Sequence, residues 1–345
     1  MNIAALACSN GLGHTRRVVA IASFMLKNGF DGKIDAFMPI AYLETLNQWE
    51  ACTFFRNHAN VNITDFYYPQ RANHKTSELY SNDWQTIHLP DLEKYDVVWS
   101  DNILQVLEIR PDAKLTGSFL WHEVFEKNVH KNGLDDFVKE QKALLTKYKP
   151  EMAGNEYFAT PDVRYKTNFF PVGLYKYSTL LKEKNQRAIL ISCGLGGEEE
   201  QETKEAIRKI ISSNIVPNEV LYVEPRVLPV VHPSWMKKAT FTSEMFNDCI
   251  AVCIRPGMGT ISDALVHHSR IFAFSRDDSF EMLHNSEVLK ELKVGERCES
   301  PFEAYLKAID FVNSEDEIEY QLLKTGHLRT DGVFATSKFI TKVNK

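Results

Sequence analysis

The chain has 345 residues, of which 44% are hydrophobic and 25% charged, a composition typical of a globular protein with room for two cores. A net charge of -6 and a pI near 6.0 argue against nucleic acid as the main partner. No run approaches the roughly 20 apolar residues that cross a bilayer, and the first residues lack the basic start of a signal peptide, so a cytoplasmic protein is expected. The six cysteines form no Cys-x-x-Cys pair, which favours buried thiols over zinc.

The first pattern in the chain predicts a strand, a glycine turn and a helix. Residues 2–8 are mostly apolar, as in a buried parallel strand, and Ser9-Asn10-Gly11-Leu12-Gly13-His14 follows. Apolar residues recur at helical spacing over 18–26, and the helix is expected to end at 28–29. A dinucleotide-binding loop would need a third glycine where Arg16 stands, so NAD is not an expected cofactor.

His14 stands near the start of this predicted helix. The positive end of the helix dipole disfavours the imidazolium, so the ring stays able to accept a proton near pH 7. That property suits a general base. The alternative is a histidine that only caps or packs the turn; the flanking Gly11 and Gly13 favour the functional interpretation.

Two later strands in the first half end in polar residues. The pattern over 97–102 predicts a strand that ends near Asp101, and the pattern over 115–120 predicts one that leads into Trp121-His122-Glu123. Ligands of open parallel sheets collect at the carboxyl ends of strands, which is the reason to consider Asp101. His122 and Glu123 would orient an acceptor hydroxyl or support His14, with a purely structural role as the alternative. Residues 67–89 show no periodicity and predict a long loop.

A second strand, glycine loop and helix follows in the middle of the chain. Residues 188–191 predict a short buried strand, Ser192-Cys193-Gly194-Leu195-Gly196-Gly197 forms the loop, and a helix is expected from Glu199 to Ile211. Because this repeats the opening pattern, the chain is expected to contain two similar α/β domains with parallel sheets.

The expected domain boundaries follow from these two openings. Residues 1–168 form the first domain, and 169–187 form a hinge and linker in which Pro171 and Gly173 fix a bend. The second domain covers 188–325. The last segment, 326–345, is expected to be helical and to pack back on the first domain.

The most distinctive motif is Arg255-Pro256-Gly257-Met258-Gly259-Thr260-Ile261-Ser262-Asp263, which follows an apolar strand. A helix is expected from about Thr260. Unpaired N–H groups at a helix start bind phosphate, and the two glycines let an anion approach closely. Asp263 would accept hydrogen bonds from the two hydroxyls of a ribose. Arg255 would contact phosphate or form a surface ion pair.

A second helix beyond this motif carries Glu281 and Asn285 on one face. These residues would contact the donor sugar or the edge of the ribose. Phosphate, ribose and sugar contacts in this order predict a nucleotide-sugar site.

This region resembles the donor half of the GT-B glycosyltransferases, especially the bacterial family that adds N-acetylglucosamine to the lipid-linked peptidoglycan precursor. That family has a Gly-x-x-Thr-x-x-Glu turn and helix, then an acidic or Gln pair before Asn-Ala. Here Asp263 stands where Glu is usual, which keeps the carboxylate but shortens its reach. Ser286 follows Asn285 where Ala is usual.

The other motifs resemble the same fold family. The Gly-x-Gly-His-x-x-Arg form of residues 11–17 resembles the first loop of GT-B transferases and, more closely, that of the nucleotide-sugar hydrolases of pseudaminic acid synthesis, which share the fold. The His122-Glu123 pair resembles one near the acceptor site of the peptidoglycan transferases. The loop around Gly194 resembles one that faces the donor phosphates.

The resemblance implies a GT-B α/β fold, with two Rossmann-like domains and parallel sheets facing an interdomain cleft. It implies a glycosyltransferase that moves a hexosyl or N-acetylhexosaminyl group from a nucleotide-sugar donor, such as a UDP-N-acetylhexosamine, to a hydroxyl of a sugar, glycolipid or other acceptor in cell-surface glycan synthesis. Inversion and independence of metal are implied, and the chain has no Asp-x-Asp motif. The alternatives are a nucleotide-sugar hydrolase and a non-catalytic nucleotide-sugar-binding subunit.

The expected site residues divide into two groups, with no metal ligand and no cofactor. The expected catalytic residues are His14, His122 and Glu123. The expected donor-binding residues are Gly11, Gly13, Gly194, Arg255, Gly257, Met258, Gly259, Thr260, Asp263, Glu281 and Asn285. A lipid-linked acceptor would add peripheral contact with the inner face of a membrane.

Overall fold

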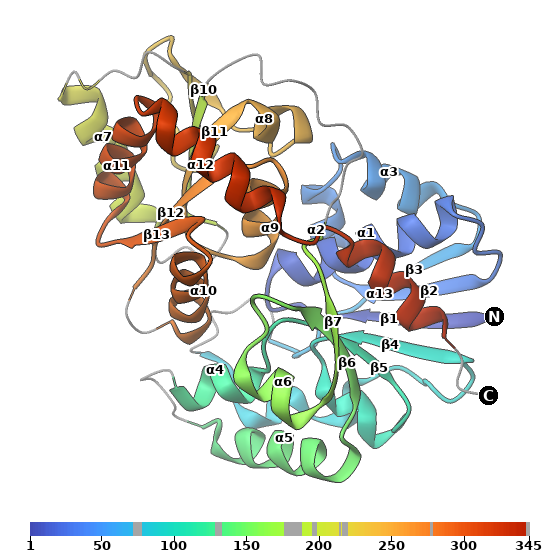
Figure 1. Ribbon diagram of the computed structural model, residues 1–345. Helices are drawn as coiled ribbons and strands as arrows, with labels where there is room; N and C mark the ends of the chain where they lie inside the picture. Colours follow the sequence, from blue (N-terminus) through green and yellow to red (C-terminus); the bar gives the residue numbers. More distant parts are fainter. Residues whose placement is uncertain are drawn as a thin grey trace. The chain divides into compact units, whose positions relative to one another are not determined.

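The computed structural model describes residues 1–71, 78–127, 133–175, 188–194, 199–213, 215, 220–276 and 279–342. The chain forms two compact units (Figure 1). Unit 1 comprises Met1–Tyr175 and Asp331–Lys345, and unit 2 comprises Lys176–Thr330. Each unit has its own parallel sheet with helices, so the predicted α/β class is confirmed.

Unit 1 contains a seven-stranded sheet in the order β3-β2-β1-β4-β5-β6-β7, with every neighbouring pair parallel. Its strands are β1 (Asn2–Ala7), β2 (Lys33–Met38), β3 (Val61–Asp65), β4 (Val97–Asp101), β5 (Lys114–Thr116), β6 (Glu151–Asn155) and β7 (Asn168–Val172). The interior strand β1 is apolar and buried from Ile3 to Ala7 because helices cover both faces of the sheet.

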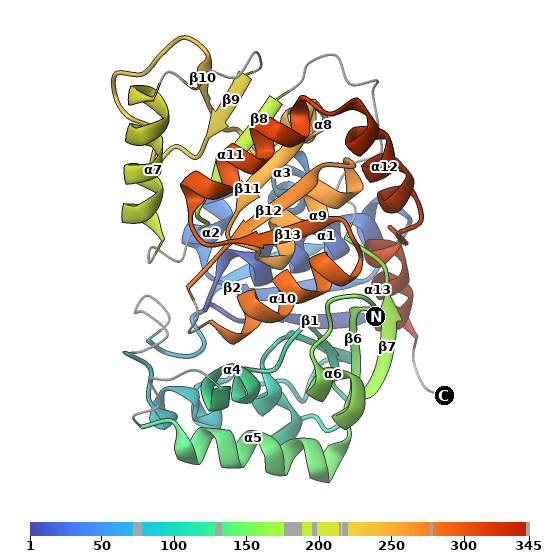
Figure 2. The ribbon, with the colours of Figure 1, turned by 60° about the vertical axis from the view of Figure 1, so that its left-hand side comes forward.

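The helices of unit 1 pack on both sides of this sheet. They are α1 (Leu12–Lys27), α2 (Ile40–Thr45), α3 (Glu50–Asn57), α4 (Trp121–Lys127), α5 (Asp135–Tyr148), α6 (Pro161–Lys166), α13 (Gly332–Thr341) and the 3₁₀ helices η2 (Ser81–Trp84), η3 (Thr86–His88) and η4 (Leu104–Glu108). Helix α1 packs against α3 and α13, and α5 packs against α4 and η4. Figures 1 and 2 show α13 and α5 on opposite sides of β1 and β4.

Unit 2 contains a six-stranded parallel sheet in the order β10-β9-β8-β11-β12-β13. Its strands are β8 (Ala188–Ser192), β9 (Val220–Val223), β10 (Met236–Lys238), β11 (Cys249–Ile254), β12 (Arg270–Phe274) and β13 (Gly295–Cys298). Its helices are α7 (Glu200–Ser212), α8 (Ser243–Asp248), α9 (Met258–Val266), α10 (Phe280–Glu291), α11 (Pro301–Val312) and α12 (Glu315–Gly326). Strands β8 and β11 and helix α11 share one buried apolar core.

Several elements differ from their predicted bounds. Strand β5 stops at Thr116, earlier than predicted, and α4 begins at Trp121. Residues 168–172, most of which the sequence assigns to the hinge, form the edge strand β7, and the rest of the predicted linker, 176–187, lies outside the described residues. Residues 81–84 and 86–88 of the predicted long loop form short 3₁₀ helices.

The strand order of each sheet reverses at one point. In unit 1 the chain builds outward from β1 through β2 and β3, then returns to the other side of β1 with β4. In unit 2 it builds outward from β8 and then returns with β11. Loops at the carboxyl ends of the two strands at such a point diverge to opposite faces and leave room for ligands. The two reversal points therefore mark the first places to look for a site.

Candidate functional site

The reversal point of unit 1 brings His14 and Asp101 together. His14 lies in the first turn of α1, directly after β1, and Asp101 is the last residue of β4. The two strands pair in register, with Ala7 opposite Asp101. The His14 Nδ1 atom lies 2.7 Å from Asp101 Oδ1. A contact between residues 87 apart in the sequence is thus a direct product of strand order.

Asp101 is the centre of a buried polar cluster. Its side chain is 0% exposed, and four hydrogen bonds reach its carboxylate. Arg17 donates from Nε at 2.7 Å and from Nη2 at 3.2 Å, and Thr116 donates from Oγ1 at 2.7 Å. Thr116 in turn accepts a hydrogen bond from Trp99 Nε1 at 2.9 Å. We call His14, Arg17, Asp101 and Thr116 the His14 cluster.

The electrostatics of the His14 cluster keep Asp101 ionised. Burial by itself would raise the pKa of Asp101, but the Arg17 guanidinium and His14 outweigh burial and hold this pKa below its ordinary value. An ionised carboxylate only accepts hydrogen bonds, so the neutral imidazole of His14 must donate from Nδ1. Its Nε2 then carries the lone pair, which is the tautomer that a general base requires.

Aromatic rings and an open loop surround the imidazole. The rings of Phe119 and Trp121 each lie 6.1 Å from the His14 ring, centroid to centroid. Gly11 precedes α1 at a φ of 134°, a conformation that L side chains rarely adopt. A Cβ added at Gly13 would meet nothing within 4 Å, so the loop is open at Gly13, while His14 itself is 5% exposed.

The other two expected catalytic residues have different partners. His122 is 0% exposed, and its Nε2 lies 2.7 Å from Asp162 Oδ2. Glu123 accepts hydrogen bonds from the Thr160 hydroxyl and from the Asp162 backbone N–H, at the start of α6. Neither residue has a contact with His14 in the described part of the chain. The structure therefore places this pair between α4 and α6.

Burial dominates the electrostatics of this second pair. It lowers the pKa of His122 and raises that of Glu123. Burial would also raise the pKa of Asp162, but Lys166 and His122 hold it below its ordinary value. His122 donates to Asp162 from Nε2, and its Nδ1 is buried without a hydrogen-bond partner.

In unit 2, the loop after β8 is held by a buried carboxylate. Gly194 has a φ of 65°, and its N–H donates to Glu224 Oε2 at 3.1 Å. The Ser192 hydroxyl donates to the same oxygen at 2.8 Å. Arg226 donates from Nε to Glu224 Oε1 at 2.7 Å and also donates to the Gly194 carbonyl. The predicted glycine loop continues into 195–198, which lie outside the described residues.

The turn after β11 presents a cation and a helix start at the reversal point of unit 2. Arg255 follows β11, and its Nε lies 3.4 Å from Glu199 Oε1, at the N-terminus of α7. Helix α9 begins at Met258, earlier than predicted, so Gly259 and Thr260 lie within its first turn. No side chain caps this helix start in the described part of the chain.

Gly257 has ordinary backbone angles at this helix start. Its φ is -77°, and a Cβ added there would meet nothing within 4 Å. Neither backbone conformation nor protein packing therefore demands a glycine. A helix start that no described side chain caps is suited to an anion.

The remaining expected donor residues lie on α9 and α10. Asp263 is buried on α9, and Asn285 is 1% exposed on α10. Asn285 donates from Nδ2 to the Pro256 carbonyl at 2.8 Å, so it braces the turn before α9. Glu281 is half-buried in the first turn of α10. Apart from Gly194 in the loop after β8, unit 2 therefore brings its expected donor residues to one turn and the helices beside it.

Sequence reasoning missed the residues that support the two reversal points. Arg17, Thr116 and Glu224 received no role, although Arg17 lies in the quoted first-loop motif. Glu199 was expected only to begin a helix, and the structure buries it to 2% exposure. Asp101 was considered only as a residue at a strand end. Its link to His14 follows from the pairing of β1 with β4, which no local pattern encodes.

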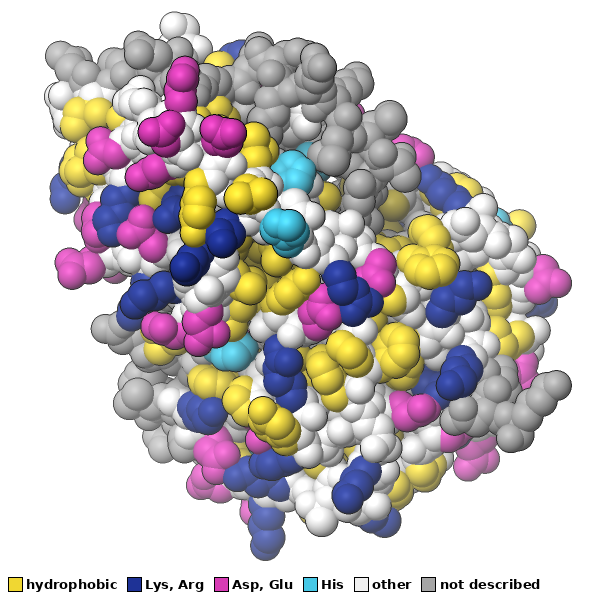
Figure 3. Space-filling view, viewed as in Figure 1, with side chains coloured by type: hydrophobic (Ala, Val, Ile, Leu, Met, Phe, Trp, Pro, Cys, Tyr) yellow, Lys and Arg dark blue, Asp and Glu magenta, His cyan; other side chains and the backbone are white. Residues whose placement is uncertain are grey.

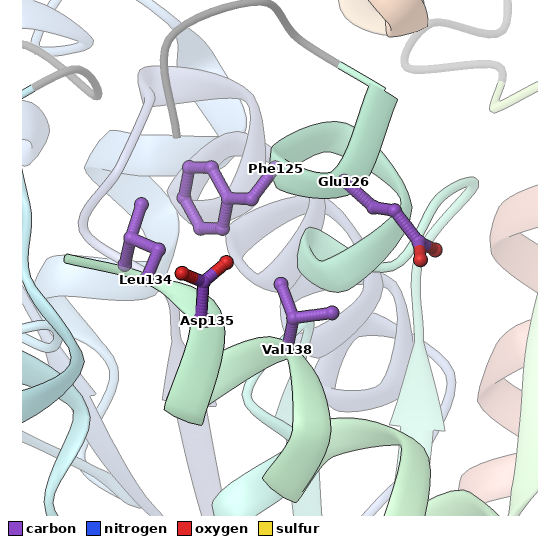
Figure 4. A pocket seen from close by; sticks show the side chains of 5 residues that line it. All are labelled: Phe125, Glu126, Leu134, Asp135 and Val138. Atoms are coloured by element: carbon purple, nitrogen blue, oxygen red, sulfur yellow. The ribbon is translucent and has the colours of Figure 1, made fainter. Parts of the chain in front are cut away.

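Outside these two reversal points, metal-ligand clusters and pockets are the features of the described residues that could form a site. No group of three or more His, Cys, Asp or Glu side chains there is placed to hold a metal ion. The small pocket between α4 and α5 is lined by Phe125, Glu126, Leu134, Asp135 and Val138, a set without a base–carboxylate pair (Figure 4). No helix among the described residues is long and apolar enough to cross a membrane. Acidic and basic side chains are intermixed on the face seen in Figure 3.

Comparisons with known proteins bear on the fold. No family model matches the chain, and no curated protein matches it in sequence. Among solved structures, the glycotransferase of kitacinnamycin matches with a TM-score of 0.70 and 10% identity, over 98% of each chain. LpCGTa in complex with UDP matches with a TM-score of 0.63 and 11% identity, over 99% of this chain and 98% of that one.

A third match is Arabidopsis thaliana UGT89C1 complexed with UDP-L-rhamnose, with a TM-score of 0.59 and 10% identity, over 94% of this chain and 92% of that one. Identities this low speak for architecture alone. The near-complete coverage and the two parallel sheets confirm the predicted fold class: the chain has the GT-B fold of these glycosyltransferases.

Proposed function

We propose that this protein is a glycosyltransferase that moves a sugar from a nucleotide-sugar donor to a hydroxyl acceptor. The observation that carries the proposal is the 2.7 Å contact between His14 Nδ1 and the buried Asp101 carboxylate, at the reversal point of a GT-B sheet. This contact leaves the lone pair of His14 on Nε2, where a substrate proton can be received.

His14 is the general base of the proposed reaction. As the acceptor oxygen forms its bond to the anomeric carbon, the acceptor proton moves to His14 Nε2, and the bond to the diphosphate breaks with its electron pair on the leaving nucleotide. The Asp101 carboxylate stabilises the imidazolium that forms. His122 and Glu123 act through position only, by bracing α4 against α6.

Unit 2 holds the donor in this proposal, and unit 1 faces the acceptor. The free N–H groups of α9 and the Arg255 guanidinium bind the diphosphate, which gains charge as the bond breaks. Asp263 accepts from the ribose hydroxyls, and Glu281 and Asn285 approach the sugar. The UDP and UDP-L-rhamnose complexes of two structural neighbours support a uridine diphosphate donor.

The finer assignments rest on the resemblance of the 257–263 motif to the peptidoglycan transferases. The proposed donor carries an N-acetylhexosaminyl or hexosyl group. The proposed reaction inverts the anomeric carbon without a metal ion and serves cell-surface glycan synthesis. A cytoplasmic protein fits this role, with contact at the inner membrane face if the acceptor is lipid-linked.

A turnover assay tests the proposal. The purified protein is incubated with a panel of UDP-sugars, with and without hydroxyl acceptors, and the release of UDP and the fate of the sugar are followed. Transfer to an acceptor is the expected result. Rapid release of free sugar without an acceptor would instead identify a hydrolase, the candidate favoured by the Gly-x-Gly-His-x-x-Arg loop, which here includes the Arg17–Asp101 contact. Binding without turnover would identify a non-catalytic subunit.

The donor half has its own test. Arg255→Gln should weaken UDP binding by about tenfold, because it removes one charge-assisted contact to phosphate. Arg270→Gln is the matched control. Arg270 is the first residue of β12, so it lies at the amino ends of the parallel strands, whereas Arg255 follows the carboxyl end of β11. Calorimetric titration with UDP measures both. Equal affinities for wild type and Arg255→Gln would remove Arg255 from the donor site.

A further inference from the structure

The Asp101 carboxylate is shared between two side chains of α1. His14 contacts Oδ1, and Arg17 donates Nε to Oδ2 and Nη2 to Oδ1. The Arg17 side chain is only 9% exposed, so this fork of hydrogen bonds is buried with the carboxylate. A planar guanidinium in this geometry fixes the orientation of a carboxylate as well as its charge.

Arg17 is itself held by the C-terminal part of unit 1. Its Cζ lies 5.6 Å from the centroid of the Tyr175 ring, in a cation–π arrangement. The Tyr175 hydroxyl lies 3.3 Å from Thr336 Oγ1, on α13. A buried chain of contacts therefore runs from α13 through Tyr175 and Arg17 to Asp101 and His14.

The contact between Tyr175 and the C-terminal segment is closely built. Tyr175 forms an antiparallel bridge with Asp331, and Asp331 Oδ1 accepts from the Gly173 N–H at 2.9 Å. The Gly332 N–H donates to the Leu174 carbonyl at 3.1 Å. A Cβ at Gly332 would lie 2.5 Å from the Gly173 carbonyl oxygen, so only glycine permits this approach.

We propose that Arg17 is a positioning residue for the transfer reaction: it holds Asp101 so that His14 keeps its lone pair on Nε2, and the segment 331–341 holds Arg17 through Tyr175. This inference deepens the proposed function and rests on it. Arg17 touches no reacting atom in this scheme. Its contribution is the charge and geometry that it gives to Asp101.

The charges around the His14 cluster indicate which group balances the Asp101 carboxylate. Among the described residues, Cys8, directly after β1, and Tyr175 are titratable groups that interact with Asp101 or Arg17. Burial raises the pKa of Cys8 to about 12 and raises that of Tyr175, so both stay neutral in the working range. Arg17 is thus the permanent cation against Asp101, and His14 is the group whose charge can change.

Loss of Arg17 would change the state of the base. With no guanidinium beside it, the buried carboxylate would be balanced only by protonation of His14. An imidazolium cannot accept a proton. In Arg17→Gln, turnover at pH 7 should therefore fall by about tenfold or more, and the acid limb of the rate profile should move up by about one pH unit or more.

Three variants and two readouts test the inference. Arg17→Gln removes the charge, Arg17→Lys keeps the charge without the fork, and Arg16→Gln is the matched control on the same helix, where Arg16 lies over the Trp49 ring. The first readout is nitrogen NMR of the imidazoles, with the His14 signals assigned by their loss in His14→Gln. The second is kcat and KM for the best UDP-sugar as a function of pH.

The expected result is a single neutral tautomer, protonated at Nδ1, in wild type and Arg16→Gln. Arg17→Gln should show a protonated ring or a mixture at pH 7, with kcat reduced, KM little changed, and activity recovered at higher pH. Arg17→Lys should give a His14 spectrum and a kcat between those of wild type and Arg17→Gln. An unchanged His14 spectrum in folded Arg17→Gln, or a loss of kcat that is uniform at all pH values, would overturn the inference.

Variants of Tyr175 test whether the segment 331–341 holds Arg17. Tyr175→Leu removes the ring and should reproduce part of the Arg17→Gln effect, whereas Tyr175→Phe keeps the ring and should change the His14 spectrum little. Equal spectra for Tyr175→Leu and wild type would separate the C-terminal segment from the cluster. If no UDP-sugar turns over while the tautomer is lost in Arg17→Gln, the proposed function fails and the positioning role of Arg17 stands.

Discussion

Two histidine–aspartate pairs of unit 1 share one distance and differ in almost everything else. His14 and Asp101 lie 2.7 Å apart, and so do His122 and Asp162. The first pair uses Nδ1 and the second uses Nε2. Asp101 is completely buried and also bonded by Arg17 and Thr116, whereas the Asp162 side chain is 20% exposed and pairs with the surface residue Lys166.

The difference shows that a short His–Asp contact does not by itself make a site. The first pair lies where the strand order reverses, with open space beside the loop at Gly13. The second lies between two short helices, with the other nitrogen of His122 enclosed by protein. In the proposed function, the base His14 therefore differs from His122 in its place in the sheet and in the ring nitrogen that the aspartate leaves without a bond.

The largest expected effect comes from the two aspartates. Asp101→Asn should lower the free energy of unfolding of unit 1 by about 3 kcal/mol at pH 7, because it removes the carboxylate that balances the buried Arg17 charge. Asp162→Asn should cost less than about 1 kcal/mol, since Lys166 is largely in solvent and Asn still accepts from His122. Urea unfolding followed by tryptophan fluorescence in a Trp235→Phe background reports on unit 1.

The sign of the pH dependence sharpens this test. The pKa of Asp101 is held below its ordinary value of 3.8, so its contribution is complete above that value and is lost as the pH falls through the lower pKa of the folded protein. The difference in the free energy of unfolding between wild type and Asp101→Asn should therefore become smaller in strong acid. An equal loss of unfolding free energy in Asp101→Asn and Asp162→Asn at pH 7 would show that the two aspartates do not differ in the way described.

The next effect is on turnover. His14→Gln should reduce kcat by about two orders of magnitude, the usual contribution of a general base, with UDP binding unchanged. His122→Gln should reduce kcat by less than threefold in protein that remains folded, because His122 only braces α4. Steady-state kinetics and calorimetry measure both variants. A greater loss of kcat in His122→Gln than in His14→Gln would exchange the two roles.

The smallest effect is a pH slope in stability. Burial lowers the pKa of His122 below its ordinary value of 6.5, so the unfolded chain binds a proton below pH 6.5 that the folded chain resists. Wild type should therefore lose stability as the pH falls from 7 to 5, by no more than about 1.4 kcal/mol per pH unit. His122→Gln should show a shallower slope over this range; parallel slopes would mean that His122 is protonated in the folded state.

Much of the fold could be predicted because it is local. The apolar runs of β1, β8 and β11 and the glycine turns after them predict parallel strands followed by helices, and those strands and helices are present. Strand β7 was assigned to a hinge because Pro171 and Gly173 indicate a bend. As an edge strand, β7 tolerates Pro171, since an edge leaves one row of backbone N–H groups unpaired.

Much less of the candidate site could be predicted from local patterns. His14 was singled out for its place at a helix start, but the partner that sets its tautomer comes from a strand 87 residues later. His122 and Glu123 were grouped with it by their residue types and by resemblance. Their actual neighbours, Thr160 and Asp162, approach only because β6 and α6 return beside α4.

The sequence by itself determined the α/β class of this protein and the turns on which a site could be built, because apolar periodicity and glycine placement act within a few residues along the chain. The expectation of a GT-B fold came from the resemblance of its motifs. Only the tertiary structure decided which histidine is oriented by a buried carboxylate and which residue balances that carboxylate. Hydrogen bonds and burial depend on distance in space, and the order of strands in a sheet brings Asp101, Arg17 and His14 within reach of one another.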